Sequence, residues 1–312
     1  MASRSGRFAP SPTGPLHLGN LRTALVAWLR ARHEGAPFLL RIEDLDQGRS
    51  RAEHEAGQLA DLRAIGIDWD GDPIRQSTRD DAYAAALALL EAADLVYPCW
   101  CTRAEIRDAA SAAHDDRPEN AYPGTCARLD APGRAEKARS GRPPALRVRA
   151  EAAQVSIDDV LLGPIRGVVD DFVVRRGDGS FAYNLAVVVD DGWQRIGEVV
   201  RGDDLAGSAP RQAWLADRLG LPPVSYVHVP LVLGPDGRRL AKRDGAVTLA
   251  DRRALGETAD DVRSALAASL GLCAPDERPT PHELVGRFAI EDLVGRTATV
   301  WDPDAVPLGR AG

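Results

Sequence analysis

Hydrophobic residues in the first third of the chain follow the spacing of helices and strands in turn. Apolar positions recur every three or four residues over 21–32, 53–65 and 80–93, which predicts three amphipathic helices. The short apolar run 38–42 predicts a buried strand, and a shorter strand is expected to end near Phe8. Strands that alternate with helices are typical of a parallel sheet, so we expect an α/β, Rossmann-like fold.

The alternation stops near Tyr97. From residue 99 to about 174 the chain is richer in Pro, Gly, Asp and Arg, and residues 114–120 read as a loop. We therefore predict an inserted subdomain at 99–174 between the two halves of a catalytic sheet, 1–98 and 175–250. Residues 251–312 are expected to form a short helical C-terminal region that ends in a Pro-rich stretch.

Composition indicates a globular, intracellular protein. Of its 312 residues, 44% are hydrophobic and 27% are charged, which is enough to bury a sizeable core. No run approaches eighteen apolar residues and the N-terminus has no apolar core of a signal peptide, so we expect a cytoplasmic monomer without membrane contact. The net charge of −7 argues against broad affinity for nucleic acid, so any such contact must come from local arginines such as Arg201, Arg211 and Arg218.

The segment 7–20, RFAPSPTGPLHLGN, carries the first candidate chemistry. Its prolines and Gly14 force a bent turn, so that a helix begins only near Leu18. Backbone N–H groups at a helix start attract anions, and His17 is placed to donate to phosphate oxygens. The turn therefore favours a triphosphate site, although an ordinary Pro/Gly-rich loop before a helix has the same composition.

A second candidate is Lys242. It is one of only two lysines, with Lys137, in a chain whose other cationic side chains are all arginines. It follows the strand-like run 227–233, in a polar loop where a compact, flexible ammonium suits a phosphate better than the planar fork of arginine. The alternative is a solvated basic loop, which remains open for Arg238, Arg239 and Arg243.

Taken together, four ordered motifs resemble those of class I aminoacyl-tRNA synthetases, in their glutamate branch. HLGN at 17–20 resembles the HIGH signature, with Asn20 in place of its last histidine. RLAKR at 239–243 resembles KMSKS, with only the second lysine intact. LRIEDLD at 40–46 and FAYNLAVVVDD at 181–191 match the same branch, and the resemblance covers residues 5–250.

This resemblance implies a socket for glutamate and a site for ATP with Mg²⁺. The implied glutamate-binding residues are Arg7, Phe8, Ala9, Pro10, Ser11, Glu43, Tyr183 and Arg201. The implied ATP-binding residues are His17, Gly19, Asn20 and Lys242, of which His17 and Lys242 are the expected catalytic residues. Two arginines suit the carboxylates of a glutamate and Glu43 suits its ammonium group. Val187 stands where the family commonly has an asparagine, which predicts one weaker contact to the amino acid.

The predicted insertion contains a candidate metal site. Cys99, Cys101 and Cys126 are close in sequence, and thiolates bind Zn²⁺ tetrahedrally. A structural zinc site takes four ligands, and the family resemblance supplies Tyr122 as the fourth. The alternative is that the three thiols are buried free cysteines, which is our expectation for Cys273.

The length of the chain bears on the acceptor of the glutamyl group. Seventy residues follow Lys242, too few for the helical anticodon-binding region of full-length glutamyl-tRNA synthetases. The chain resembles a shortened paralogue that places glutamate on queuosine in the anticodon loop of tRNA(Asp). Three alternatives remain open: a truncated synthetase that charges the 3′ end of tRNA(Glu), a non-catalytic protein that binds tRNA or adenylate, and another HIGH-type nucleotidyltransferase.

Overall fold

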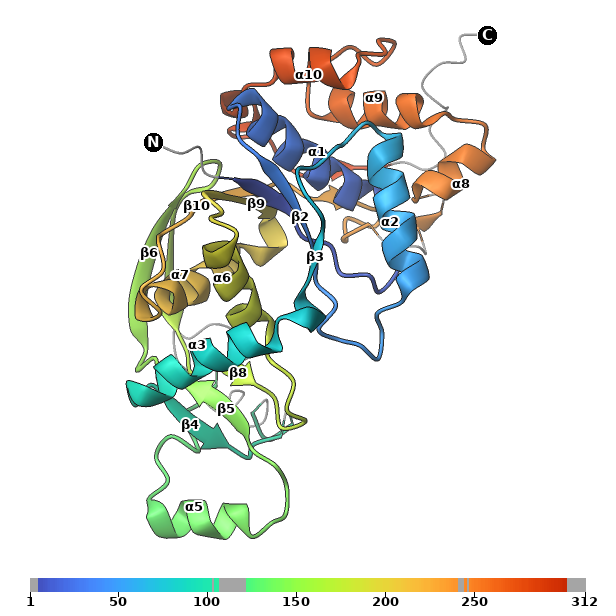
Figure 1. The fold of residues 1–312 in the computed structure, drawn as a ribbon. Coiled ribbons are helices and arrows are strands. Elements are labelled where there is room, and N and C mark those ends of the chain that lie inside the picture. The colour runs from blue at the N-terminus through green and yellow to red at the C-terminus, as the bar shows by residue number, and fades with distance from the viewer. Residues whose placement is uncertain (1–4, 103, 107–121, 241–243, 246, 302–312) are drawn as a thin grey trace.

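The computed structural model describes residues 5–102, 104–106, 122–240, 244–245 and 247–301 (Figure 1). The first half of the chain forms β1 (Gly6–Phe8), α1 (Leu18–His33), β2 (Phe38–Ile42), α2 (Ala52–Ala64), β3 (Ile74–Arg75), η1 (Gln76–Thr78), α3 (Asp80–Ala92), β4 (Val96–Cys99), α5 (Ala131–Ala138), β5 (Ala145–Val148) and β6 (Ala153–Asp159). The second half forms β7 (Gly163–Val169), β8 (Val173–Arg175), α6 (Tyr183–Trp193), β9 (Glu198–Gly202), η2 (Asp203–Ser208), α7 (Ala209–Arg218), β10 (Ser225–Val229), β11 (Val232–Leu233), α8 (Leu249–Ala254), α9 (Ala259–Ser269), α10 (Pro281–Arg287), η4 (Ile290–Leu293) and β12 (Thr299–Val300).

The central sheet is mostly parallel. One part has the order β1-β2-β3 and the other β7-β6-β10-β9, and a parallel bridge between Ser5 and Ile196 places β1 beside β9. The chain thus builds outward from β1 on one side and returns to β9 on the other. Such a reversal opens a crevice at the carboxyl ends of the two central strands, which is where open α/β sheets bind ligands.

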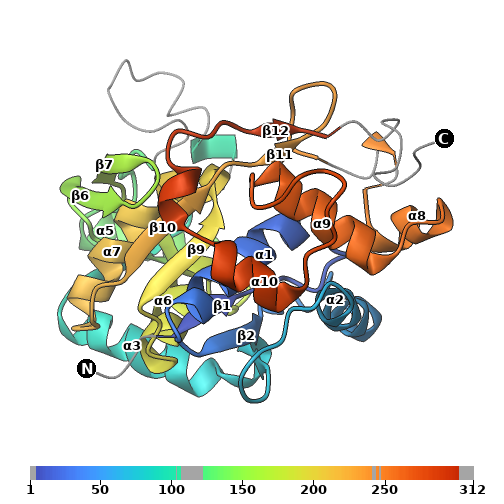
Figure 2. The same ribbon diagram turned by 90° about the horizontal axis from the view of Figure 1, so that it is seen from above.

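Helices cover both faces of this sheet. Leu18, Leu21, Leu25 and Leu29 form the helical stripe of α1 and are fully buried against one face, where α9 and α10 pack behind α1 (Figure 2). The helices α3, α6 and α7 cover the other side, in a second core that contains Trp214. The predicted helices over 21–32, 53–65 and 80–93 are observed with boundaries shifted by at most three residues, and the predicted strand 38–42 is β2.

The C-terminal helices begin at sequence signals that are visible in the chain. Thr248, Thr258 and Thr280 are the N-caps of α8, α9 and α10, and each accepts a hydrogen bond from the backbone N–H of an acidic residue three positions later. The acidic side chain in turn accepts from the threonine N–H, which completes a capping box. The expected helical C-terminal region also contains β12, which pairs with β11. The expected Pro-rich end lies outside the described residues.

The strand-like run 227–233 is wrong as a single strand. It divides into β10 and β11 at Pro230, which has no N–H to donate to a ladder. The carbonyl of Pro230 instead accepts a hydrogen bond of 2.9 Å from the guanidinium of Arg22 on α1. Most of the motif at 181–191 lies in the helix α6, whose apolar residues pack into the second core at helical spacing.

Residues 99–174 contribute to two sheets. Strands β4, β5 and β8 form a separate antiparallel sheet, below which α5 lies in Figure 1. The hairpin of β6 and β7 joins the central sheet, since Asp159 at the end of β6 pairs in register with Tyr226 of β10. The loop expected at 114–120 lies outside the described residues. No helix within the described ranges has the length and hydropathy that crossing a bilayer requires.

A buried carboxylate ties three elements together beneath the sheet edge. Asp190 on α6 is fully buried and accepts hydrogen bonds from Gln76 at 2.9 Å, from Arg79 at 2.6 Å and from the hydroxyl of Tyr83 at 2.8 Å. These donors come from η1, α3 and the residue between them. Loss of the charge on Asp190 leaves the largely buried Arg79 without its carboxylate partner and removes one of the anions near Arg41, which lies 4.0 Å away.

We therefore expect Asp190→Asn to lower the free energy of unfolding by about 3 kcal/mol, since removing one partner of a buried ionic cluster is strongly destabilising. The measurement is urea unfolding followed by circular dichroism. Asp217→Asn is the matched control, because Asp217 is 74% exposed and 3.8 Å from Arg218. Its effect should stay within about 0.5 kcal/mol. Equal stability of the two variants would contradict this role for Asp190.

Candidate active site

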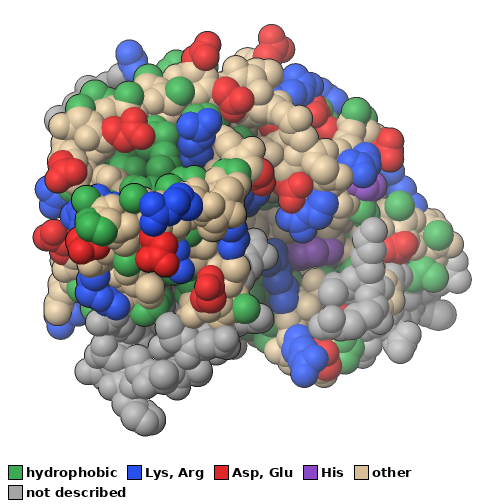
Figure 3. Space-filling view, turned by 90° about the horizontal axis from the view of Figure 1, so that it is seen from below, with side chains coloured by type: hydrophobic (Ala, Val, Ile, Leu, Met, Phe, Trp, Pro, Cys, Tyr) green, Lys and Arg blue, Asp and Glu red, His purple; other side chains and the backbone are tan. Residues whose placement is uncertain are grey.

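A cavity of about 500 Å³ lies at the carboxyl ends of β1, β2 and β9. Figure 3 shows the hollow on this face, with cationic and histidine side chains around it. All the described residues predicted to bind glutamate or ATP line this one cavity: Arg7, Phe8, Ala9, Pro10, Ser11, His17, Gly19, Asn20, Glu43, Tyr183 and Arg201. Segments far apart in the sequence are therefore brought together at the crevice that the strand order creates.

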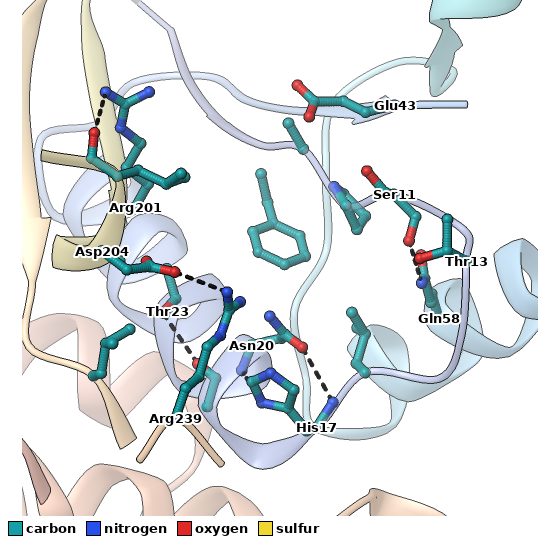
Figure 4. A pocket seen from close by; sticks show the side chains of 18 of the residues that line it. Ser11, Thr13, His17, Asn20, Thr23, Glu43, Gln58, Arg201, Asp204 and Arg239 are labelled. Carbon is teal, nitrogen blue, oxygen red and sulfur yellow. Dashed lines mark hydrogen bonds and ion pairs between the residues drawn. The ribbon is translucent and has the colours of Figure 1, made fainter. Parts of the chain in front are cut away.

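The proline-rich turn that forms one wall is held by donors from neighbouring elements. The side-chain amide of Gln58 on α2 donates to the carbonyls of Ser11 at 3.0 Å and Gly14 at 2.7 Å (Figure 4). The N–H of Glu43 donates to the carbonyl of Pro10 at 2.9 Å. A turn whose prolines lack N–H groups needs such external donors, because it has few of its own. Gln58 was not identified from the sequence.

His17 closes the start of α1. Its Nδ1 accepts the backbone N–H of Asn20 at 3.2 Å, and the Asn20 side-chain oxygen accepts the N–H of His17 at 3.2 Å. This reciprocal cap places the proton of the neutral ring on Nε2. Burial, and secondarily the charge of Arg239, lower the pKa of His17 to about 4, so the ring is neutral at physiological pH. A Cβ at Gly19 would lie 3.0 Å from the ring, so glycine there makes room for this packing.

The helix start offers fewer free donors than the sequence suggested. The N–H of Leu18 donates to the carbonyl of Val247 at 2.8 Å, and the N–H of Asn20 is occupied by His17. Among the hydrogen bonds of the described residues, the N–H of Gly19 has no partner. Any anion at this end of α1 would therefore meet the Gly19 N–H and side chains, rather than a full turn of backbone donors.

Three buried arginines lie in or behind the cavity wall, and carboxylates compensate the charge of two of them. Arg7 lies 3.5 Å from Asp191 and donates to the carbonyl of Val200 at 3.0 Å. Arg41, fully buried, lies 2.7 Å from Asp191 and 3.4 Å from Glu43. Asp191 on α6 thus anchors both guanidinium groups, which fixes one side of the cavity. Arg41 and Asp191 lie inside motifs recognised in the sequence, but the pattern assigned them no role.

The third arginine, Arg201 on β9, is held by neutral groups alone. Its guanidinium donates to Nε2 of His228 at 3.0 Å, to the side chain of Gln212 at 2.7 Å and to the carbonyl of Leu205 at 3.2 Å. Within the described ranges, no carboxylate oxygen lies within 4.0 Å of it. It is 5% exposed, and burial lowers its pKa. A buried cation without an anionic partner is a site for an anionic ligand.

Glu43 provides the opposite charge across the cavity. Figure 4 shows the Glu43 carboxylate and the Arg201 side chain on opposite sides of the cavity. Burial raises the pKa of Glu43, and the nearby charge of Arg41 counteracts that rise. Tyr183, at the start of α6, also lines the cavity. The cavity therefore offers sites for both an anion and a cation at a spacing set by the sheet.

Lys242 and Val187 are the remaining residues with a predicted role at the cavity. Lys242 lies outside the described residues, but Arg239, which begins the KMSKS-like segment, lines the cavity and pairs with Asp204 at 2.7 Å. Val187, on α6, is 1% exposed and does not line the cavity, so the weaker contact to the amino acid stays a prediction. Its side chain packs with other apolar residues of the core that contains Trp214.

The three predicted thiols come together in the small sheet region. The sulfurs of Cys99, Cys101 and Cys126 all lie within 4.8 Å of one another, with 3.5 Å between Cys101 and Cys126. The hydroxyl of Tyr122 lies 3.4 Å from the Cys99 sulfur and 3.6 Å from the Cys101 sulfur. Tetrahedral Zn²⁺ with sulfur bonds of about 2.3 Å separates its ligands by about 3.6–3.8 Å, which these spacings approach.

Two hydrogen-bond donors outside the four candidate ligand groups point at the cluster. The guanidinium of Arg147 donates to the Cys99 sulfur at 3.3 Å and stacks over the Tyr122 ring at 3.8 Å. The N–H of Cys126 donates to the Tyr122 oxygen at 2.8 Å. Cys273 lies elsewhere, against the carbonyl of Ser264. The donor set therefore fits a zinc ion. The three cysteines could be recognised from the sequence because they are close in the chain.

Comparison with known proteins agrees with the motif order and the fold. Residues 5–278 match the family described as tRNA synthetases class I (E and Q), catalytic domain. A protein of Nocardia farcinica named Glutamyl-Q tRNA(Asp) synthetase is 58% identical over 91% of this chain and 89% of its own length. A protein of Symbiobacterium thermophilum with the same name is 47% identical over 91% of both chains.

Solved structures show the same architecture. A glutamate tRNA ligase from Elizabethkingia meningosepticum, crystallised in complex with its amino acid, is 26% identical with a TM-score of 0.81, and the match covers 97% of this chain and 68% of that one. The chain is a ligase that belongs to the class I tRNA synthetases of the E and Q branch, together with the curated relatives named Glutamyl-Q tRNA(Asp) synthetase.

Proposed function

We propose that this enzyme activates L-glutamate with ATP and transfers it to queuosine at the wobble position of tRNA(Asp), in the cytoplasm. The observation that carries the glutamate assignment is the charge pattern of the cavity. Arg201 is a buried cation without a carboxylate partner in the described part of the chain, and Glu43 faces it. A glutamate ligand has two carboxylates and one ammonium group, which Arg7, Arg201 and Glu43 complement.

In the first step, the α-carboxylate of glutamate attacks the α-phosphorus of ATP in line and pyrophosphate leaves. This reaction needs positioning and charge neutralisation rather than a strong acid or base. His17, neutral with its proton on Nε2, is placed to donate to a phosphate oxygen, and the amide of Asn20 and the N–H of Gly19 lie beside it. Mg²⁺ bound with ATP would neutralise phosphate charge.

Lys242 is proposed to stabilise the leaving pyrophosphate. Because that charge develops mainly in the transition state, Lys242→Ala should lower the rate of adenylate formation on the order of a hundredfold, with little change in the KM for ATP. The measurement is glutamate-dependent ATP/pyrophosphate exchange. Lys137→Ala, on the exposed helix α5, is the matched control and should leave the rate unchanged. Equal losses in the two variants would contradict the KMSKS assignment.

In the second step, a cyclopentenediol hydroxyl of queuosine attacks the acyl carbon of the glutamyl-adenylate. An ester bond forms and AMP leaves. The printed name of the curated relatives, Glutamyl-Q tRNA(Asp) synthetase, supports this acceptor. The competing acceptor is the 3′-terminal adenosine of tRNA(Glu), which the same adenylate would esterify.

The acceptor is tested with labelled glutamate, ATP and three tRNAs: tRNA(Asp) with queuosine, the same tRNA with guanosine, and tRNA(Glu). Labelling should require queuosine and persist after removal of the 3′-terminal adenosine, because the reacting hydroxyl lies in the anticodon loop. ATP/pyrophosphate exchange should also proceed without tRNA. Labelling that depends on the 3′ end, or that favours tRNA(Glu), would establish the truncated-synthetase alternative.

We further propose that Cys99, Cys101, Cys126 and Tyr122 hold one structural zinc ion per chain. Metal analysis of freshly purified, reduced protein should find about one zinc, and Cys101→Ser should lose it because a structural site needs its full ligand set. Cys273→Ser is the matched control and should retain the metal. Tyr122→Phe tests the fourth ligand and should release zinc to a chelator faster than the wild type. Zinc-free wild-type protein would exclude the site.

A further inference from the structure

A buried chain of three side chains ends at the cavity. Asp159 of β6, His228 of β10 and Arg201 of β9 contact one another in that order, and each is 5% exposed or less. Arg201 and His228 are register partners on adjacent parallel strands. Asp159, which contacts His228, comes from the hairpin of β6 and β7, and this hairpin lies within the segment predicted as an insertion. No pattern in the sequence indicates this contact, because Asp159 and His228 are 69 residues apart.

The geometry fixes the proton on the imidazole of His228. Its Nδ1 lies 2.7 Å from the carboxylate of Asp159, and its Nε2 lies 3.0 Å from Nε of Arg201. A carboxylate accepts and a guanidinium donates, so the ring must donate through Nδ1 and accept through Nε2. Burial and the neighbouring Arg201 lower the pKa of His228, which keeps the ring neutral and its acceptor available.

The carboxylate of Asp159 is itself held in place. Its Oδ1 accepts the N–H groups of Leu161 at 3.0 Å and Leu162 at 2.9 Å, and its Oδ2 accepts the N–H of His228 at 3.1 Å. The acid is therefore anchored by the turn that follows β6. The imidazole ring separates this fixed charge from the guanidinium of Arg201.

This arrangement differs from that of the neighbouring arginines. Arg7 and Arg41 contact Asp191 directly, and such contact neutralises much of the charge that a ligand would otherwise meet. Arg201 is oriented by an imidazole, an amide and a carbonyl, all of them neutral. It is thus fixed in position while no protein carboxylate in the described ranges competes for it.

We propose that Asp159 and His228 are positioning residues that orient Arg201 for the carboxylate of the substrate and thereby set the affinity for glutamate. This inference rests on the proposed function, in which Arg201 binds glutamate. Asp159 selects the tautomer of His228, and His228 supplies the neutral acceptor that aims the guanidinium. The β6–β7 hairpin consequently contributes to amino-acid binding without contacting the amino acid.

Two variants of His228 separate its role in orienting Arg201 from its role in filling the core. Both variants remove the ring, but they keep different hydrogen-bonding groups. Glutamine has its amide near the position of Nε2 and retains an acceptor for Arg201, whereas asparagine has its amide near Nδ1 and retains only the contact to Asp159. In ATP/pyrophosphate exchange, His228→Asn should raise the KM for glutamate roughly tenfold or more, with the KM for ATP unchanged. His228→Gln should raise it less. His282→Asn, an exposed control on α10, should have no effect.

Asp159→Asn tests the tautomer. An amide nitrogen in place of Oδ2 would donate to Nδ1 of His228, which moves the ring proton to Nε2, against the guanidinium of Arg201. This variant should therefore raise the KM for glutamate as His228→Asn does. If any variant fails to fold, ¹⁵N NMR of the wild-type imidazoles still tests the arrangement. The signal of His228 should be that of a neutral ring protonated on Nδ1 at pH 7, and a ring protonated on Nε2, or a charged ring, would overturn the proposal.

Arg201→Lys distinguishes glutamate binding by Arg201 from the orientation of Arg201 by His228 and Asp159. If this variant leaves the KM for glutamate unchanged, the assignment of Arg201 in the proposed function is wrong. If it raises the KM while His228→Asn and Asp159→Asn match the wild type, glutamate binding by Arg201 stands and the positioning role is overturned. Equal KM values for His228→Asn and His228→Gln would also overturn it, because they would show an effect of packing alone.

Discussion

The burial of three guanidinium groups at one edge of the sheet is the constraint on which the site depends. Removing an ion from water costs several kcal/mol unless charges and hydrogen bonds compensate it. Asp191 compensates Arg7 and Arg41, while Asp190 lies beside Arg41 and joins α6 to α3 and η1. The position of α6 against the sheet is therefore set by these charges together with its apolar face. The walls of the cavity follow from that position.

The parts of the fold predicted from the sequence are those with a local cause. Helical spacing located α2 and α3, Gly14 and the prolines placed the start of α1 near Leu18, and a short apolar run gave β2. The thiol cluster was also recognisable, because its cysteines are close in the chain. Each of these features is determined by residues within a few turns or one loop of one another.

The parts that could not be predicted depend on pairing between distant segments. Nothing in the sequence of β6 shows that it joins β10, and the contact of Asp159 with His228 exists only once that pairing has formed. The division of 227–233 at Pro230 had a visible signal, which the apolar run obscured. Arg41 lies in a recognised motif, but its buried partners on α6 are 150 residues away. Charge pairs that form across a core join residues far apart in the chain, so no short sequence pattern predicts them.

His17 both caps α1 and is proposed to contact a phosphate, and this combination affects the entropy of binding. A free histidine side chain samples several rotamers, and a ligand that requires one of them must restrict that freedom on binding. Here the cap with Asn20, and the packing over Gly19, restrict the ring when α1 folds. The conformational freedom of this group is therefore lost during folding, before a nucleotide arrives. The site is preorganised at this position. The same contacts stabilise the first turn of α1 and hold the His17 ring in the orientation that a ligand would need.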